Sequence, residues 1–351
     1  MNNQMTEFKP DDFELIRKNQ DDFVDESYAK ESYWKDILMR FVKNKGAIFG
    51  LIFIILIVIM AIIGPNLNDY TFDSQIIAHQ NLAPRVKSIE SLGLGIFDGA
   101  ETMNTSTGVV EINKYVNPEK ETGLENTYYW FGTDVLGRDI FTRTWSGTRI
   151  SLYIALVAVL VDMIFGMSYG LISGYFGGRV DLIMQRLSEV LNGIPTLVLV
   201  TLLIIIMKPG LGTITLALAL TGWIGMSRVA RAQVLKLKEQ EFILASKTLG
   251  AKDFFIIFKE ILPNIFGQLI IMSMFSVPNA IFTEAFLAFV GLGVPAPNAS
   301  LGSLISDAFK SFTTHPYMIV FPVIVLALIM LSFNLLADGL RDAFDPKMKE
   351  M

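Results

Sequence analysis

The sequence predicts an all-α protein that crosses a membrane several times, because it is strongly apolar and contains six long apolar runs. Apolar residues make up 52% of its 351 residues and charged residues only 18%, and the mean hydropathy is +0.47. The runs with little or no charge lie at 47–63, 150–175, 190–207, 209–227, 264–290 and 317–337. Each is close to the ~20 residues that a helix needs to cross the hydrocarbon. We therefore expect six transmembrane helices.

The residue inventory excludes several kinds of chemistry. The chain has no cysteine, which excludes disulfides and thiol catalysis, and only two histidines, His79 and His315. A net charge of −5 argues against nucleic acid as a partner. No Gly-Lys pair occurs, so the phosphate-binding loop of an ATPase is missing. We expect no catalytic residue, no metal site and no cofactor bound by this chain.

Basic residues near the apolar runs predict the orientation. We expect the protein in the plasma membrane. The basic residues Arg40, Lys43 and Lys45 precede the first apolar run, which places the N-terminus on the cytoplasmic side. Six crossings return the C-terminus to the same side. The predicted parts, in order, are a cytoplasmic tail (1–45), a first transmembrane helix (46–64), a long extracellular segment (65–148), a core with helices two to six (149–337) and a cytoplasmic tail (338–351).

The tail before the first span contains an amphipathic pattern. From Ser32 onward, Trp34, Ile37, Leu38 and Phe41 share one face of a helix. Aromatic and basic residues beside a span suit a helix that lies along the inner membrane surface. A cytoplasmic extension of the first span explains the pattern equally well.

Helix-breaking residues interrupt the chain between the second and third spans. Gly174, Gly177 and Gly178 are expected to end one helix, and the run from Asn192 to Pro195 to interrupt the next, since proline lacks a backbone donor. Such breaks are tolerated in a membrane where they line a cavity. Close helix packing on small residues is the alternative interpretation.

A charged helical stretch separates the fourth and fifth spans. Phe242, Ala245 and Leu249 recur with helical spacing, and Gly250 suits a helix end. A second short helix can begin at Asp253, before Pro263 and the fifth span. The pattern predicts a helix–glycine–helix element, either resting on the membrane or docking on another protein.

This stretch resembles the EAA loop of ABC-importer permeases, the segment that docks on the ATPase. In "EFILASKTLGAKDFFIIFKEILPN", Ala245 and Ser246 fall at the two alanines, Gly250 at the glycine, and Leu262-Pro263 at the closing pair. The chain departs from the motif at Leu244, which replaces its glutamate, and at Ser246 and Lys252.

Four further stretches narrow the resemblance. "FGTDVLGRDIFTR" (131–143) resembles a Gly-Thr-Asp…Gly-Arg-Asp signature, and 40–50, 284–302 and 334–347 resemble the other signatures of the same branch. The four stretches occur in the same order along this chain as in one kind of subunit. This is the second permease subunit (permease C type) of oligopeptide, dipeptide and nickel importers, which the chain resembles. The signature residues before the second span are Gly132, Thr133, Asp134, Gly137, Arg138 and Asp139.

The resemblance implies a type I ABC-importer permease that takes up oligopeptides or dipeptides. It implies a homologous permease partner, two ATPase subunits that bind ATP and Mg²⁺, an extracytoplasmic substrate-binding protein, and surrounding membrane lipid. The coupling loop would be 238–263. The residues implied to contact the ATPase are Glu241, Ala245, Ser246, Leu249, Gly250, Phe254, Leu262 and Pro263.

Three questions stay open at this stage. Nickel is an alternative substrate, although the chain offers few soft or imidazole ligands. An ion-coupled transporter is an alternative mechanism, with Asp162 and Glu284 as its membrane-embedded acids. Asp134, Arg138 and Asp139 either brace a turn or contact the binding protein or the substrate.

The transport path is expected between this chain and a partner permease. The candidate path residues are Asn192, Pro195, Glu284 and Phe289.

Overall fold

The computed structural model describes residues 33–93, 95–105, 108–116 and 123–344. Residues 1–32 of the expected N-terminal tail and 345–351 of the C-terminal tail lie outside the described residues. The helices are α1 (Tyr33–Lys43), α2 (Lys45–Ile63), α3 (Lys87–Glu90), α4 (Ile140–Val161), α5 (Met167–Phe176), α6 (Gly178–Asn192), α7 (Thr196–Met207), α8 (Leu211–Leu237), α9 (Glu241–Thr248), α10 (Asp253–Phe255), α11 (Leu262–Leu287), α12 (Leu301–Phe309) and α13 (Tyr317–Phe344). The strands are β1 (Ala100–Thr105) and β2 (Gly108–Asn113).

Five helical stretches in the described part of the chain are long and apolar enough to cross a membrane. They are Lys45–Asn66, Ile140–Phe176, Leu211–Leu237, Asp253–Leu292 and Tyr317–Phe344. A sixth is reached only if α6 and α7 together count as one span, because these two helices are bent by 78° relative to each other. Five of the six predicted spans are therefore present as long helical stretches, and at the position of the third the structure has the bent pair α6–α7.

The break lies where the sequence placed its helix-breaking residues. Gly193 ends α6, and Pro195 has an extended conformation (φ −58°, ψ 130°) before α7 begins at Thr196. Upstream, α5 ends at Phe176, and Gly177 has a φ of +62°, a value that favours glycine.

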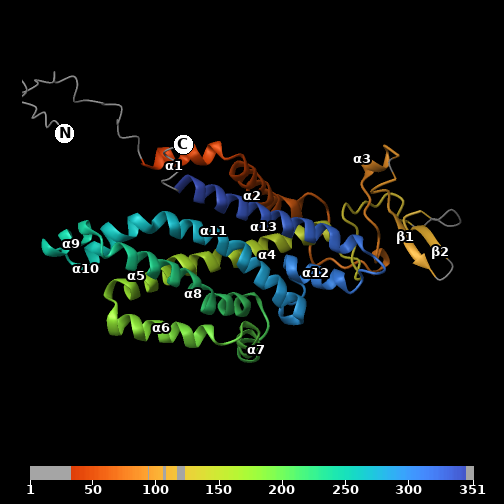
Figure 1. The fold of residues 1–351 in the computed structure, drawn as a ribbon. Coiled ribbons are helices and arrows are strands. Elements are labelled where there is room, and N and C mark those ends of the chain that lie inside the picture. Colours follow the sequence, from red (N-terminus) through yellow and green to blue (C-terminus); the bar gives the residue numbers. More distant parts are fainter. Residues whose placement is uncertain (1–32, 94, 106–107, 117–122, 345–351) are drawn as a thin grey trace, which may run out of the picture.

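Small residues let the long helices approach closely. A side chain on Gly50 of α2 would lie 2.6 Å from the Ser332 carbonyl oxygen of α13, and one on Gly174 of α5 would lie 2.9 Å from Val234 on α8. Gly174 lies inside α5, so the prediction that it helps to end the helix is wrong. It serves close packing instead, one of the two interpretations of this joint. Figure 1 shows α4, α8, α11 and α13 side by side along the bundle.

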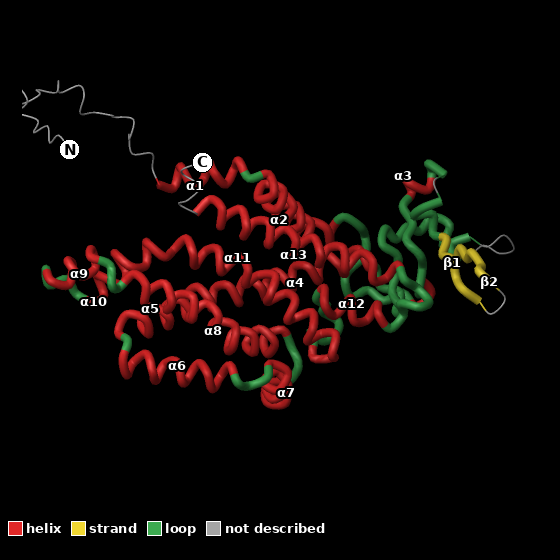
Figure 2. Tube along the Cα trace, viewed as in Figure 1, coloured by secondary structure: helices red, strands yellow, loops and turns green. Residues whose placement is uncertain are grey.

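The segment between the first two spans folds at one end of the bundle. Its β1–β2 ribbon is antiparallel and pairs Ala100 with Asn113. Leu82, Tyr115 and Tyr129 form its buried cluster. Figure 2 shows the strands and most of the loops at this end, opposite α9 and α10. The expectation of an all-α chain is corrected here, because the segment contains this two-stranded ribbon.

Arg85 holds this segment together from its centre. The side chain is buried, and its guanidinium donates to Glu90 Oε1 at 2.7 Å and to the Glu125 carbonyl at 2.8 Å. It also lies 5.0 Å from the centre of the Tyr115 ring and 4.8 Å from that of Tyr128. A buried charge requires such compensation.

The amphipathic helix before the first span is a separate element. Asn44 ends α1 and caps α2 by accepting a hydrogen bond from Ala47 N. Ile37 and Phe41 of α1 are buried in one cluster with Ala343 at the end of α13. The stripe is therefore used in part to join the first and last spans.

Candidate functional site

The helix–glycine–helix element, residues 241–261, lies at the end of the bundle away from the strands (Figure 1). The helix α9 is followed by Gly250, whose φ of +83° favours glycine, and the second helix begins at Asp253 as predicted. That helix continues through a π-helical turn, Ile256–Ile261, directly into α11, with Pro263 in its first turn. The element is thus continuous with a membrane span.

The inner side of this element is fixed to the bundle. Ile243, Ile256 and Ile261 are fully buried in one cluster with residues of α5 and α8. Ser246 Oγ donates to Glu260 Oε1 at 2.6 Å, which joins the two helices across the glycine.

A third helix holds the second half of the element in place. Tyr175 at the end of α5 donates from its hydroxyl to Asp253 Oδ1 at 2.6 Å. The Lys247 ammonium nitrogen lies 4.8 Å from the centre of the same tyrosine ring. One aromatic side chain thereby contacts both helices of the element.

The outer side carries apolar residues that this chain leaves uncovered. Phe242 is 46% exposed, Leu249 88% and Phe254 71%. Glu241 and Ala245 are exposed beside them. The predicted stripe is therefore present, but it points away from the bundle. Burying Leu249 and Phe254 against another surface would contribute about 1.5–3 kcal/mol each.

The segment between α2 and α4 (residues 64–139) is called the connecting segment below. The Gly-Thr-Asp…Gly-Arg-Asp signature forms a tight turn at its end, packed against the earlier part of the same segment. Gly132 and Gly137 have φ values of +79° and +71°. Side chains there would overlap backbone atoms of Leu82 and Ile76. Thr133 Oγ1 accepts from Leu82 N at 2.8 Å and donates to the His79 carbonyl. Both glycines are required by close approach.

Charged residues brace this turn. Asp134 accepts from Arg138 Nε at 2.6 Å and from the Arg138 amide at 3.0 Å. Asp139 caps α4 by accepting from Thr142 N at 2.8 Å, and also accepts from Asn68 at 2.8 Å. These bonds give the turn the bracing role considered from the sequence.

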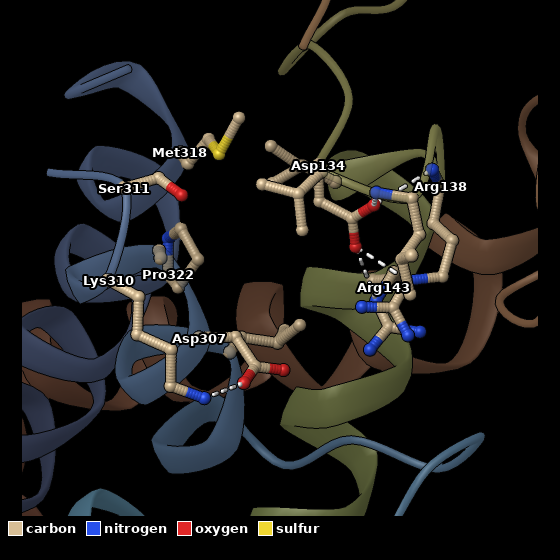
Figure 3. Close-up of a pocket in the computed structure, with 13 residues that line it drawn as sticks. Asp134, Arg138, Arg143, Asp307, Lys310, Ser311, Met318 and Pro322 are labelled. Atoms are coloured by element: carbon tan, nitrogen blue, oxygen red, sulfur yellow. Dashed lines mark hydrogen bonds and ion pairs between the residues drawn. The ribbon is translucent and has the colours of Figure 1, made fainter. Parts of the chain in front are cut away.

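A cavity of about 370 Å³ adjoins the turn. Figure 3 shows Asp134, Arg138 and Arg143 on one side, and Asp307, Lys310, Ser311, Met318 and Pro322 on the other. Arg143 is 2% exposed and donates to the Phe72 carbonyl at 2.9 Å. Sequence reasoning did not single out Arg143, because its position inside an apolar helix gives no sign of these distant partners.

A second cavity, of about 330 Å³, lies between α4, α8 and α11. Asn192, one of the candidate path residues, lines it, as does Thr196 next to Pro195. The acid Asp162 lines it as well, from a π-helical turn (Asp162–Gly166) between α4 and α5. The break between α6 and α7 therefore borders a polar cavity, as the cavity interpretation of this joint expects.

The other two candidate path residues lie elsewhere. Glu284 is fully buried, and its Oε2 is 3.4 Å from Ser151 Oγ, near the start of α12. Phe289 is half exposed, and its ring centre is 5.3 Å from that of Phe309. Neither residue lines the cavity that contains Asn192. Across the described residues, no three His, Asp or Glu side chains are grouped so as to hold a metal ion.

Comparisons with known proteins show the family of this chain. Residues 166–350 match the family model described as binding-protein-dependent transport system inner membrane component. Residues 32–84 match the model for the N-terminal TM domain of oligopeptide transport permease C. The chain belongs to the family of binding-protein-dependent transport system inner membrane components, and it is called the permease below. The permease is accordingly a multi-pass membrane transport subunit and not an enzyme.

Curated relatives match over almost the whole length of the permease. The oligopeptide transport system permease protein OppC of Bacillus subtilis (strain 168) is 41% identical over 338 residues, 96% of this chain and 97% of the relative. The dipeptide transport system permease protein DppC of the same organism is 43% identical over 319 residues, 91% and 87% of the two chains. DppC of Lactococcus lactis subsp. cremoris (strain MG1363) is 39% identical over 349 residues, 97% and 98% of the two chains.

A solved structure shares the fold. The inward-facing MetNI methionine ABC transporter (CY5 native crystal form) matches with a TM-score of 0.50 and 16% identity, over 58% of this chain and 97% of that one. This likeness supports an ABC-importer permease fold for the helical core.

Proposed function

We propose that the permease is one of two membrane subunits of an ATP-driven importer of oligopeptides or dipeptides. It pairs with a homologous permease, two ATPase subunits that bind ATP and Mg²⁺, and an extracytoplasmic substrate-binding protein. Both termini lie in the cytoplasm, and residues 65–148 lie outside. The relatives named for oligopeptide and dipeptide transport, which match over nine-tenths or more of this chain, support the substrate class.

In this proposal the helix–glycine–helix element couples the permease to an ATPase. The observation that carries it is the contrast between the two sides of the element. Its inner side is fixed by buried isoleucines and by the Ser246–Glu260 bond, whereas Leu249 and Phe254 are exposed on its outer side. On a surface that faces water, patches of large exposed apolar side chains mark sites of interaction with another protein. The continuity of the element with α11 lets a push on it move a membrane span.

The transport cycle follows from this coupling. Closure of the ATPase pair on ATP draws the coupling elements of the two permeases together, and the path between them opens toward the binding protein. Hydrolysis of ATP returns the path to its inward opening. At the far end of the bundle, the folded segment with β1 and β2 contacts the binding protein.

Uptake by reconstituted complexes tests this function. Proteoliposomes containing the permease, its partner permease and both ATPases are supplied with the binding protein outside and ATP inside. We expect accumulation of a labelled peptide that requires both ATP and the binding protein. Accumulation of nickel without accumulation of peptide would overturn the substrate class, and uptake driven by an ion gradient without ATP would overturn the mechanism.

A further inference from the structure

Polar side chains from α6, α7, α8, α11 and the π-helical turn after α4 line the cavity of about 330 Å³ between α4, α8 and α11. These are Asp162, Asn192, Thr196, Thr221, Arg228, Ser276, Asn279 and Thr283. All lie in helices of the candidate spans or of the bent pair. Polar side chains at membrane depth are costly and therefore mark functional positions.

Asp162 is the acid in this cavity. It is 4% exposed and lies on a π-helical turn, a feature that is frequent at functional sites. Its Oδ1 lies 3.7 Å from the position of a side chain on Gly222, so the absence of a side chain there leaves room beside the carboxylate. No Lys, Arg or His within the described ranges forms an ion pair with Asp162. A buried carboxylate without a cation is expensive, and a cationic ligand would relieve that cost.

Two threonine hydroxyl groups on the cavity wall add acceptors rather than donors. Thr221 donates to the Ala217 carbonyl of its own helix at 3.4 Å, and Thr283 donates to the Asn279 carbonyl at 2.8 Å. Their hydrogens are used in this way, and their oxygen lone pairs remain for a ligand. A ligand group with several N–H donors and a positive charge fits this wall.

Arg228 of α8 lines the same cavity, further along the helix from Gly222 and Asp162. It follows Gly222 by six positions, which corresponds to roughly 9 Å along a helix axis. The cavity therefore has a negative group near Gly222 and a positive one about two turns away. A short zwitterionic chain, with an ammonium group at one end and a carboxylate at the other, matches this order of charges.

On the basis of the proposed function, we propose that Asp162 binds the α-ammonium group of the transported peptide, whose carboxylate points toward Arg228. Every peptide with a free N-terminus carries this ammonium group. Recognition of it is therefore compatible with carriage of many different side chains.

The electrostatic part of the proposal can be tested without a peptide. Asn279→Cys places a single thiol on the cavity wall of this naturally cysteine-free chain. In the assembled permease–ATPase complex, we compare its labelling by a cationic and an anionic methanethiosulfonate reagent. Asp162→Asn should reduce the ratio of the cationic to the anionic rate roughly fivefold or more, and Asp162→Glu should preserve it. An unchanged ratio in Asp162→Asn would overturn the proposal.

Peptide protection tests the ligand itself. With the binding protein omitted, so that its own selectivity does not enter, a tripeptide with a free N-terminus should protect the thiol of the Asn279→Cys variant at concentrations roughly tenfold lower than its N-acetylated form. Asp162→Asn should abolish this difference, and Arg228→Gln should weaken protection by the free peptide more than by its C-terminal amide. Equal protection by free and N-acetylated peptides would contradict the role of Asp162.

Matched controls separate this inference from the proposed function. Glu189→Gln removes a carboxylate whose ion pair with Arg186 is exposed, and it should change neither labelling nor protection. Peptide uptake by wild-type proteoliposomes is measured in parallel. If wild type takes up no peptide, the proposed function fails. If wild type takes up peptide and Asp162→Asn is indistinguishable in both assays, only the assignment of Asp162 fails.

Discussion

Ser246 donates a hydrogen bond of 2.6 Å to Glu260 across the turn at Gly250, and this bond joins the two helices of the coupling element. The other carboxylate oxygen of Glu260 is buried and has no hydrogen-bond partner within the described residues. Ser246 is therefore the side chain that compensates this acid.

Ser246→Ala should loosen α9 relative to α11. The change leaves Glu260 without that donor, which costs about 1–3 kcal/mol for a buried group. We expect faster hydrogen exchange of the amides of 241–250, and less peptide taken up per ATP hydrolysed. Thr248→Ala is the control, since Thr248 bonds only to the Leu244 carbonyl of its own helix. Equal exchange in the two variants would contradict this account.

Gly250→Val should detach the ATPase. The position has a φ of +83°, and a β-branched residue there is strained by about 1–2 kcal/mol even though nothing lies within 4 Å of the new side chain. We expect ATPase subunits to be lost during purification while the permease stays in the membrane. Gly212→Val is the control, because Gly212 is equally unobstructed but has no positive φ. Full ATPase binding and uptake by Gly250→Val would show that the docking assignment is wrong.

The connecting segment should lose stability in mild acid. His79 Nδ1 lies 2.6 Å from the Tyr129 hydroxyl, and burial lowers the pKa of His79 below its ordinary value of 6.5. The imidazole of His79 therefore binds a proton more readily in the unfolded segment than in the folded one. The folded segment is stabilised at pH values above the ordinary pKa, and this stabilisation is lost as the pH falls through the lowered pKa of the folded state. Tyrosine fluorescence should report earlier thermal unfolding at about pH 5 than at about pH 7.5. His79→Gln should reduce this difference, and a wild-type protein that is more stable in acid would contradict the sign.

The β1–β2 ribbon should contribute to docking of the binding protein. Replacing residues 100–113 by a short Gly-Ser linker removes the ribbon but retains Leu82, Tyr129 and the signature turn. We expect weaker binding of the binding protein to the complex, measured by surface plasmon resonance, with ATPase content unchanged. Unchanged binding would mean that the ribbon is a tolerated insertion.

The sequence predicted those features whose cause is local. The length of the apolar runs predicted the spans. Gly193 and Pro195 predicted the break between α6 and α7, and Gly250 predicted the turn after α9, because these features depend on the backbone preferences of a few residues. The features it did not predict depend on contacts between distant segments. Arg143 reaches the Phe72 carbonyl, and Tyr175 reaches Asp253, through a fold that no short window of sequence contains.

The position of Glu284 illustrates the same limit. An acid near the end of a predicted span suggested a path residue, and that assignment stays a prediction; within this chain the side chain is buried beside Ser151. Asp162, with the same sequence signal, lines a cavity. Helical periodicity alone does not tell these two environments apart, because which face is covered depends on the neighbouring helices.

Site-directed cross-linking tests the coupling element most directly. A single cysteine replaces Leu249, which is 88% exposed on the element, or Ile77, which is 72% exposed in the connecting segment at the opposite end. Each variant is assembled with the ATPase subunits and treated with a short cysteine-to-lysine cross-linker. We predict that Leu249→Cys forms a cross-linked product with the ATPase, with a yield that changes when ATP is trapped, and that Ile77→Cys forms none. A product from Ile77→Cys, with none from Leu249→Cys, would contradict the account.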